Sequence, residues 1–386
     1  MSARRVLIHV QHLLGIGHLK RAATVAHACA ERGLQVTLAS GGAPVEGLDL
    51  GDAKLVQLPA LASRDETFAT LVDENGRRIG DAWRTRRCAR LLELFAAVRP
   101  HVVVIEMFPF GRRKLGFELL PLLEAARVAR PKPWIASSVR DVLTTRHPRR
   151  SAEAARWARQ YFDAVLVHGD PIVIRFEESF PMAAAIADKF DYTGYVAGPA
   201  ARRGSSRSPG WNEVIVSTGG GAVGETLLRT ALEARPFSRS AGTLTWRLIA
   251  GENLAENTFA ALVAAAPEGV VVERTRPDLA RLLANCAVSV SQGGYNTVVD
   301  VLRARARAVI VPFARESETE QAFRAERLEA LGLVRCVDEH DLTAARLVAA
   351  VDAALAGPRP RPAAVALDGA ERSATAIAGW AEQIDD

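Results

Sequence analysis

The residues best suited to bind a phosphorylated ligand lie in the last third of the chain, directly after a short apolar segment at 286–290. They are Gly293, Gly294, Tyr295, Asn296, Thr297 and Asp300. The apolar segment contains β-branched residues and predicts a buried strand. The two glycines allow unusual backbone angles and leave no Cβ in the way of a ligand. A helix is predicted to begin at Val298, capped by Asn296 or Thr297.

The predicted helix start gives this segment its chemistry. Free N–H groups and a partial positive charge in a first turn suit a phosphate or diphosphate. Asp300 is predicted to lie within that first turn, where its carboxylate could accept hydrogen bonds from the diol of a ribose. An ordinary capped turn between a strand and a helix is the alternative that this stretch alone leaves open.

A second candidate site lies near the N-terminus, in the loop at 15–18 that ends in Gly17-His18. The apolar run 6–10 predicts a first parallel strand, so the loop sits at a carboxyl strand end, where open α/β sheets bind ligands. Its spacing is not a dinucleotide fingerprint, because Arg21 and Ala22 stand where the third glycine is needed. A helix start lowers the pKa of His18, and a neutral imidazole can take a proton from an attacking hydroxyl. A capping or surface histidine is the alternative.

Charged residues also follow two other predicted strands. Glu106 ends the buried run 101–105, and it could orient His18, bind an acceptor hydroxyl or cap a helix. Arg140 and Asp141 end the run 134–139, where they could contact an acceptor or form an ion pair that closes the sheet. His168 and Asp170 end a further strand at 163–167, and the sequence assigns them no role.

A triple glycine follows the strand predicted at 213–218 and precedes a helix at Glu225. It comprises Gly219, Gly220 and Gly221. Backbone N–H groups in such a loop can approach a phosphate closely. The lysine of a triphosphate-binding loop is absent, which argues against triphosphate hydrolysis.

Several of these motifs together resemble family 28 glycosyltransferases, which include the N-acetylglucosaminyl transferase that makes lipid II. The resemblance rests on the Gly-Gly-Tyr-Asn-Thr segment, on the apolar strand at 309–313 with its Pro312, and on Glu320-Gln321 followed by Arg324. The loop at 15–18 is similar to the Gly-x-Gly-His loop of that family. The same loop, with an arginine like Arg21, occurs in a related nucleotide-sugar hydrolase.

The resemblance implies a role for each matching position. Asp300 would bind the ribose, Glu320 and Gln321 the sugar hydroxyls, and the loop with Thr275 and Arg276 the nucleobase. By its position, Asp278 would cap the following helix. On the acceptor side, the candidate catalytic residues are His18, which the resemblance favours, and Glu106, which its strand-end position suggests. Gly17, Arg21, Arg140 and Asp141 are the candidate acceptor contacts. The lipid II enzyme has glutamine in place of Glu320, which leaves the sugar open.

The fold predicted on this basis is α/β, with two Rossmann-like doubly wound domains facing a cleft, the GT-B fold. Residues 1–200 would form the acceptor-side domain and residues 201–368 the donor-binding domain. The boundary falls in the small, polar segment 200–210, which reads as a linker. A C-terminal helix at 369–386 often crosses back onto the first domain in such folds.

Composition narrows the class of protein. The chain has 386 residues, 49% hydrophobic and 24% charged, with a net charge of +5. No zinc-finger spacing or basic–aromatic stripe indicates nucleic acid, and four separated cysteines argue against a disulfide framework or a zinc site. The absence of a signal region or an apolar span predicts a cytoplasmic protein. The predicted helix 83–98 has a polar face formed by Arg84, Arg86, Arg87 and Arg90. A solvated face is favoured, and peripheral contact with the anionic inner membrane face is left open.

The sequence thus predicts a glycosyltransferase, a hexosyltransferase that uses a nucleotide-diphosphate sugar, with UDP the first choice. His18 would be the base, and helix starts would stabilise the leaving diphosphate, so no metal or cofactor is expected. A nucleotide-sugar hydrolase is the nearest alternative, followed by a UDP-sugar 2-epimerase. A non-catalytic nucleotide-sugar-binding protein is an alternative from another class.

Overall fold

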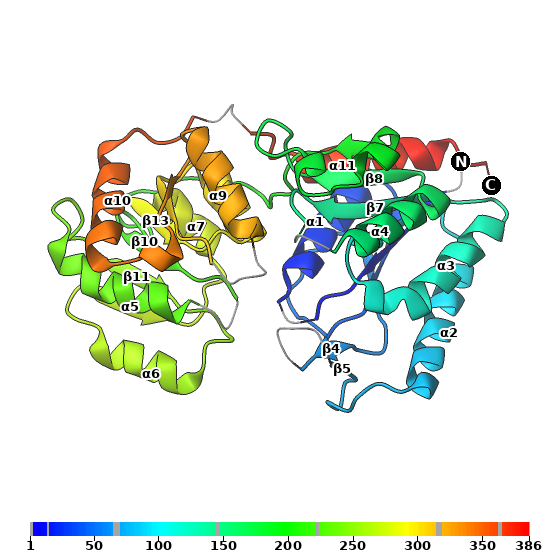
Figure 1. The fold of residues 1–386 in the computed structure, drawn as a ribbon, viewed down its shortest axis with the longest axis horizontal. Coiled ribbons are helices and arrows are strands. Elements are labelled where there is room, and N and C mark those ends of the chain that lie inside the picture. Colours follow the sequence, from blue (N-terminus) through cyan, green and yellow to red (C-terminus); the bar gives the residue numbers. More distant parts are fainter. Residues whose placement is uncertain are drawn as a thin grey trace. The chain divides into compact units, whose positions relative to one another are not determined.

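The computed structural model describes residues 3–13, 15–64, 70–143, 147–220, 224–313, 319–361 and 365–385. The chain divides into two compact units. Unit 1 comprises Met1–Pro171, Arg175–Val196 and Asp368–Asp386, and unit 2 comprises Ile172–Ile174 and Ala197–Leu367. Each unit is built on one parallel sheet (Figure 1).

The sheet of unit 1 has seven parallel strands. In spatial order they are β3 (Lys54–Gln57), β2 (Gln35–Ser40), β1 (Arg5–Val10), β6 (Val102–Glu106), β7 (Trp134–Arg140), β8 (Ala164–His168) and β9 (Phe190–Tyr192). The short strands β4 (Ala62–Ser63) and β5 (Leu71–Val72) pair separately. The central strands are apolar and buried on both faces, as parallel sheets require.

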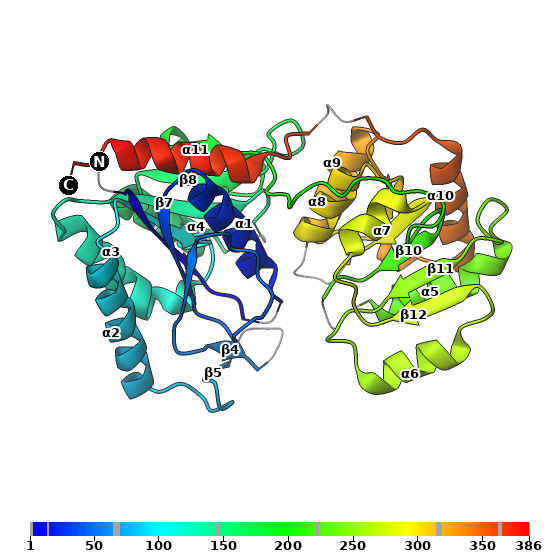
Figure 2. The same ribbon diagram turned by 180° about the vertical axis from the view of Figure 1, so that it is seen from behind.

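Helices cover both faces of this sheet. They are α1 (Gly17–Glu31), α2 (Asp81–Val98), α3 (Gly116–Val128), α4 (Pro148–Tyr161) and α11 (Gly369–Glu382), with the 3-10 segments η1 (Arg113–Leu115), η2 (Phe176–Glu178) and η3 (Ala183–Lys189). Residues of β1 alternate between two cores: Val6 and Ile8 pack with α1 and α11, and Leu7 packs with α2 and α3. Figure 2 shows α11 running beside α1, where Trp380 stacks on Trp134.

The prediction that Arg87 lies on the exposed face of α2 is wrong. Arg87 is fully buried. Its guanidinium forms a two-point ion pair with Glu118 of α3, and it also donates to the backbone oxygen of Gly41. A buried arginine needs such partners for its charge and its donors, so α2 turns this residue toward the sheet rather than toward water.

Unit 2 has a six-stranded parallel sheet. The strand order is β12 (Val270–Glu273), β11 (Trp246–Ile249), β10 (Val214–Ser217), β13 (Val288–Ser291), β14 (Ala308–Ile310) and β15 (Arg335–Cys336). The helices are α5 (Glu225–Ala234), α6 (Glu256–Ala265), α7 (Leu279–Asn285), α8 (Tyr295–Ala304), α9 (Glu320–Ala330) and α10 (Ala344–Ala356), with η4 (Arg235–Phe237) and η5 (Glu339–Asp341). Residues of α5 and α10 share a core cluster with Trp246 and β10.

The predicted fold class is confirmed: both sheets are doubly wound and parallel. No helix in the described ranges is both long enough and apolar enough to cross a membrane.

Candidate active site

The first candidate site lies between β1 and β6, where the strand order of the unit 1 sheet reverses. The chain runs from β1 through α1 to β2 on one side, whereas β6 leads through α3 to β7 on the other. The loops after β1 and β6 therefore separate at the carboxyl edge, the usual ligand position in open α/β sheets. His18 is the second residue of α1, and Glu106 is the last residue of β6. The fold thus joins two residues 88 positions apart.

Glu106 binds two side chains from the first turns of α1. His18 Nδ1 is 3.0 Å from Glu106 Oε1, and the guanidinium of Arg21 donates to the same oxygen. Residues three apart share one face of a helix, and Arg21 Nη2 accordingly lies 3.2 Å from His18 Nδ1. Glu106 and Arg21 are buried, whereas the His18 side chain is 17% exposed. His18 is therefore the member of this cluster that a substrate can reach.

The electrostatics of the cluster fix both charge states. Burial lowers the pKa of His18 to about 3, and the charge of Arg112 acts in the same direction. Burial would raise the pKa of Glu106, but the charge of Arg21 and the hydrogen bond with His18 hold it well below its usual range. The result is a neutral imidazole against an ionised carboxylate. The neutral imidazole that binds a carboxylate through one nitrogen keeps the other nitrogen for a second partner, and the neutral form is the one a general base requires.

The sequence analysis missed a third strand that contributes to this cluster. Ser138 of β7 donates a hydrogen bond from its hydroxyl to Glu106 Oε2. The parallel register pairs Glu106 directly with Ser138. An alignment of the two strands by their ends would have paired Glu106 with Arg140 instead, because β7 continues for two residues beyond Ser138.

The predicted acceptor-side residues lie at the same carboxyl edge. Gly17 is the first residue of α1, and Arg140 closes β7 opposite His168 in the neighbouring strand. Asp141 is fully buried, where its carboxylate accepts hydrogen bonds from the Tyr195 hydroxyl at 3.1 Å and from a backbone N–H at 2.9 Å. Asp141 therefore anchors this loop, and Arg140 is the more accessible of the pair.

The second candidate site lies at the corresponding position of unit 2, between β10 and β13. The loops after these adjacent strands contain the predicted glycines. Gly219 has a φ of +67°, and a Cβ there would lie 3.7 Å from Thr297 Oγ1 of α8. Gly251, with a φ of +76°, approaches the Gly219 carbonyl so closely that a Cβ would clash with it. Gly220 accepts a hydrogen bond from the Asn253 side chain. Gly221 lies outside the described residues.

Gly293 is held in place by a buried arginine. Arg324 Nη1 donates to the Gly293 carbonyl at 2.9 Å, and the guanidinium carbon lies 5.7 Å from the centre of the Tyr295 ring. A Cβ on Gly293 would come within 3.1 Å of the Gln321 carbonyl, whereas a Cβ on Gly294 would meet no atom within 4 Å. Gly293 therefore permits α8 and α9 to approach, and Gly294 leaves the helix start open to a ligand.

The predicted start of α8 is wrong by one turn. The helix begins at Tyr295 and its N-cap is Gly294, which has extended backbone angles and no side-chain capping bond. Asn296 and Thr297 are thus first-turn residues rather than caps, and Asp300 lies in the second turn. The glycine adopts the cap conformation unaided, so no capping side chain is needed. Thr297 and Asp300 share one face of the helix, both partly exposed.

Comparison with protein-family models matches residues 214–377 to the glycosyltransferase family 28 C-terminal domain. This range covers the sheet of unit 2 and both of its glycine loops. Residues 214–377 thus resemble the C-terminal domain of family 28, and the chain has the GT-B fold. The family match and the fold together support a glycosyltransferase activity. No curated protein matches this sequence.

Solved structures of glycosyltransferases have a similar fold. The calicheamicin glycosyltransferase CalG4 is 18% identical with a TM-score of 0.61, over 99% of this chain and 97% of that chain. MurG of Acinetobacter baumannii is 16% identical with a TM-score of 0.56, over 99% of both chains. The spinosyn rhamnosyltransferase SpnG, complexed with thymidine diphosphate, is 16% identical with a TM-score of 0.58, over 99% of this chain and 96% of that chain.

In the family 28 domain, the loop predicted to hold the nucleobase is rich in ion pairs. Arg276 binds both carboxylate oxygens of Asp278, at 2.8 and 2.9 Å, and Thr275 Oγ1 lies 3.3 Å from Glu252 Oε1. Asp278 occupies the N-cap position of α7 but makes no capping bond, so its predicted capping role is wrong. The carboxylate binds Arg276 instead of a backbone N–H of the helix, because a two-point contact with a charged guanidinium is stronger than a hydrogen bond from a single neutral N–H.

The residues predicted to bind the sugar begin α9 of the family 28 domain. Glu320 is the first residue of the helix, and Gln321 Oε1 accepts a hydrogen bond from the Phe313 N–H at 3.1 Å. Tyr295 is only 4% exposed and packs beside Arg324. Tyr295 and Gln321 therefore make contacts within unit 2 that hold Arg324 and the backbone at Phe313, whereas Glu320 lies at the start of α9.

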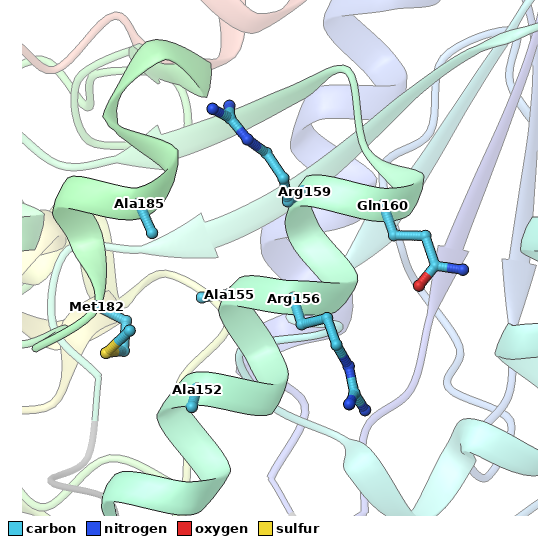
Figure 3. Close-up of a pocket in the computed structure, with 7 residues that line it drawn as sticks. All are labelled: Ala152, Ala155, Arg156, Arg159, Gln160, Met182 and Ala185. Atoms are coloured by element: carbon cyan, nitrogen blue, oxygen red, sulfur yellow. The ribbon is translucent and has the colours of Figure 1, made fainter.

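A shallow open groove of about 520 Å³ lies elsewhere on unit 1, between α4 and η3. Figure 3 shows Met182, just before η3, and Ala185 of η3 facing Ala152 and Ala155 of α4. Its polar members are Arg156, Arg159 and Gln160. None of these residues belongs to the His18–Glu106 cluster, and the groove gathers no acid–base chemistry. The two sheet edges are the better candidates.

Proposed function

We propose that this family 28-like protein transfers a hexose from a nucleotide-diphosphate sugar to an acceptor hydroxyl, with UDP as the first candidate nucleotide. The observation that carries the proposal is the His18–Glu106 pair. It lies at the ligand-binding edge of one sheet, in a protein whose other sheet belongs to a family 28 domain. A neutral histidine beside a buried carboxylate is an arrangement used for general acid–base catalysis, which a protein that only binds nucleotide sugars would not need.

In the proposed reaction, the acceptor oxygen forms a bond to the anomeric carbon of the donor sugar. The bond from that carbon to the diphosphate breaks, and its electron pair leaves with the nucleoside diphosphate. His18 Nε2 takes the proton of the attacking hydroxyl, while Glu106 stabilises the imidazolium that forms. Arg140, at the end of β7, is the candidate contact for the acceptor.

The leaving diphosphate would be stabilised by the start of α8. Its first turn carries free backbone N–H groups and the positive end of the helix dipole, next to Gly294 and the loop at 218–220. Preorganised donors of this kind contribute about 10²–10³-fold each to the rate. The proposal therefore includes no metal ion, and transfer should survive a chelator.

The first test is thermal stabilisation by UDP, dTDP, GDP, ADP and CDP. Preferential binding to the native state raises the melting temperature, and a ligand at 100 times its Kd adds about 2.7 kcal/mol. UDP is expected to give the largest shift. The main competitor is dTDP, because SpnG was solved with thymidine diphosphate. The shift should be lost in Asp300→Asn.

The second test follows product formation with the nucleotide sugar that binds best. Transfer to an added acceptor, lost in His18→Gln while nucleotide binding persists, supports the transferase. Release of free sugar without transfer indicates the hydrolase instead. Nucleotide binding that is unchanged in His18→Gln, with no turnover in the wild type, indicates a non-catalytic binding protein.

Cell fractionation tests the proposed location, which is cytoplasmic. Of the arginines on α2, Arg84 and Arg90 are 46% and 53% exposed, whereas Arg87 is buried. Arg84 and Arg90 pair with Asp81 and Glu93. These pairs favour the solvated face over a membrane contact, and we expect the protein in the fraction free of membranes.

A further inference from the structure

A buried chain of hydrogen bonds continues from Glu106 into the sheet of unit 1. Ser138 Oγ contacts Glu106 Oε2 on one side and lies 2.9 Å from His168 Nε2 on the other. His168 Nδ1 lies 2.9 Å from Thr193 Oγ1. Ser138, His168 and Thr193 are 6%, 0% and 1% exposed. Two adjacent strands, β7 and β8, and the residue just after β9 thus support one carboxylate through the oxygen that does not bind His18.

The direction of each hydrogen bond in this chain follows from the carboxylate. Ionised Glu106 can only accept, so Ser138 must donate its single proton to it. Ser138 Oγ can then only accept from His168, which places the His168 proton on Nε2. Burial lowers the pKa of His168 to about 3, and the charge of Arg21 adds to this effect. A neutral His168 has one ring proton, so its Nδ1 accepts from the Thr193 hydroxyl.

The same reasoning fixes the tautomer of His18. Its Nδ1 lies 3.0 Å from Glu106 Oε1, and a lone pair facing a carboxylate at that distance would be repelled. Nδ1 therefore carries the proton, and Nε2 carries the lone pair. Arg21 Nη2 comes within 3.2 Å of Nδ1 because both groups donate to one oxygen. With Oε2 held by Ser138, Oε1 remains directed at His18 and Arg21.

We propose that Ser138 and His168 are positioning residues which, through Glu106, hold His18 in the tautomer protonated on Nδ1 and thereby keep Nε2 as the proton acceptor. The catalytic consequence rests on the proposed transferase function, whereas the tautomer is a property of the protein alone. The sequence placed His168 at a strand end without a role, and the structure connects it to His18 through two intervening side chains.

The test is the ¹⁵N spectrum of histidine-labelled full-length protein at pH 7, in which the ring-nitrogen shifts distinguish the tautomers. The chain has eight histidines, and His18→Gln and His168→Gln assign the two of interest. In the wild type we expect His18 protonated on Nδ1 and His168 protonated on Nε2. Finding His18 protonated on Nε2 would overturn the proposal without any activity measurement.

Ser138→Ala removes the central link and should shift His18 toward a mixture of tautomers, whereas Ser138→Thr keeps the hydroxyl and should keep the wild-type pattern. Ser137→Ala is the matched control. Ser137 is also a buried hydroxyl of β7, but it donates to the Phe108 carbonyl at 2.8 Å. Successive residues of a strand point to opposite faces, so this loss should leave the His18 signal unchanged. An unchanged His18 tautomer in Ser138→Ala refutes the positioning role.

Measurements of kcat and nucleotide affinity in the Ser138 variants distinguish the positioning role from the proposed transferase function. If the transferase proposal holds, Ser138→Ala should lower kcat about tenfold, leave nucleotide affinity unchanged and be rescued by Ser138→Thr. A protein with the expected tautomers but no transferase activity would contradict the function and leave the positioning role intact. Normal kcat together with the expected tautomer change would contradict the catalytic consequence.

Discussion

The carboxyl edges of the two sheets differ in the residues that form them: charged and polar side chains in unit 1, and glycines in unit 2. At the edge of unit 1, side chains form the candidate site: Glu106 and Arg21 are a buried ion pair, and the partly exposed His18 binds the same carboxylate. At the edge of unit 2, Gly219 and Gly294 leave the backbone beside the start of α8 without covering side chains. The difference teaches that acid–base chemistry needs buried, paired groups with shifted pKa values, whereas diphosphate binding needs an unobstructed helix start.

The largest expected difference between the two edges is in how their variants affect kcat and nucleotide affinity. His18→Gln should lower kcat by about 10²–10⁴-fold, the usual contribution of a general base, with nucleotide affinity unchanged. Asp300→Asn should do the reverse and weaken nucleotide binding first. Steady-state kinetics with nucleotide titration measures both. If His18→Gln weakened nucleotide binding as much as it slowed turnover, the assignment of chemistry to unit 1 would fail.

Acid should destabilise unit 1 through its buried histidines. His18 and His168 both have folded pKa values of about 3, below the unfolded value near 6.5. The unfolded chain therefore binds protons first, and the stabilisation is complete above pH 6.5 and lost as pH falls toward 3. Each histidine contributes up to about 1.4 kcal/mol per pH unit, or about 2–4 kcal/mol together between pH 6.5 and 5.

Urea unfolding at these two pH values measures this loss. The double variant His18→Gln/His168→Gln provides the control, since it should flatten the dependence over this range. A slope that survives in the double variant would assign the acid sensitivity to other groups.

The two adjacent glycines of unit 2 should respond differently to the same added methyl group. Gly293→Ala places a Cβ 3.1 Å from the Gln321 carbonyl, and overpacking of this kind costs about 1–3 kcal/mol. Gly294→Ala meets no atom within 4 Å, so the melting temperature should hold while nucleotide affinity falls. Calorimetry with and without nucleotide compares them. Unchanged affinity in Gly294→Ala would mean that the ligand does not approach this backbone.

The smallest effect is expected at Arg276. Its ion pair with Asp278 joins side chains that are 29% and 31% exposed, and such pairs contribute about 0–1 kcal/mol. Arg276→Gln should therefore change stability little, and any effect should appear as a change in preference among nucleobases. Competition between UDP and dTDP measures that preference. A loss of stability well above this range would make Arg276 a structural residue of the loop.

The sequence by itself determined the features that depend on neighbours along the chain. Apolar runs separated by helical segments specified the α/β class, and the glycine clusters at 219 and 293–294 marked the turns that follow β10 and β13. His18 after a glycine loop indicated acid–base chemistry. Each of these signals is local, because strand burial, turn geometry and helix starts depend on a few consecutive residues.

Only the tertiary structure decided which distant residues meet. The register of β6 and β7 paired Glu106 with Ser138, and a side-chain hydrogen bond connected Ser138 to His168 of β8. The packing of α2 on α3 buried Arg87 against Glu118. Local competition also went undetected, as when Gly294 replaced the predicted cap of α8 and Arg276 captured the carboxylate of Asp278. Parallel strands pair across long connections, so the charge environment that makes His18 neutral depends on contacts that no sequence spacing records.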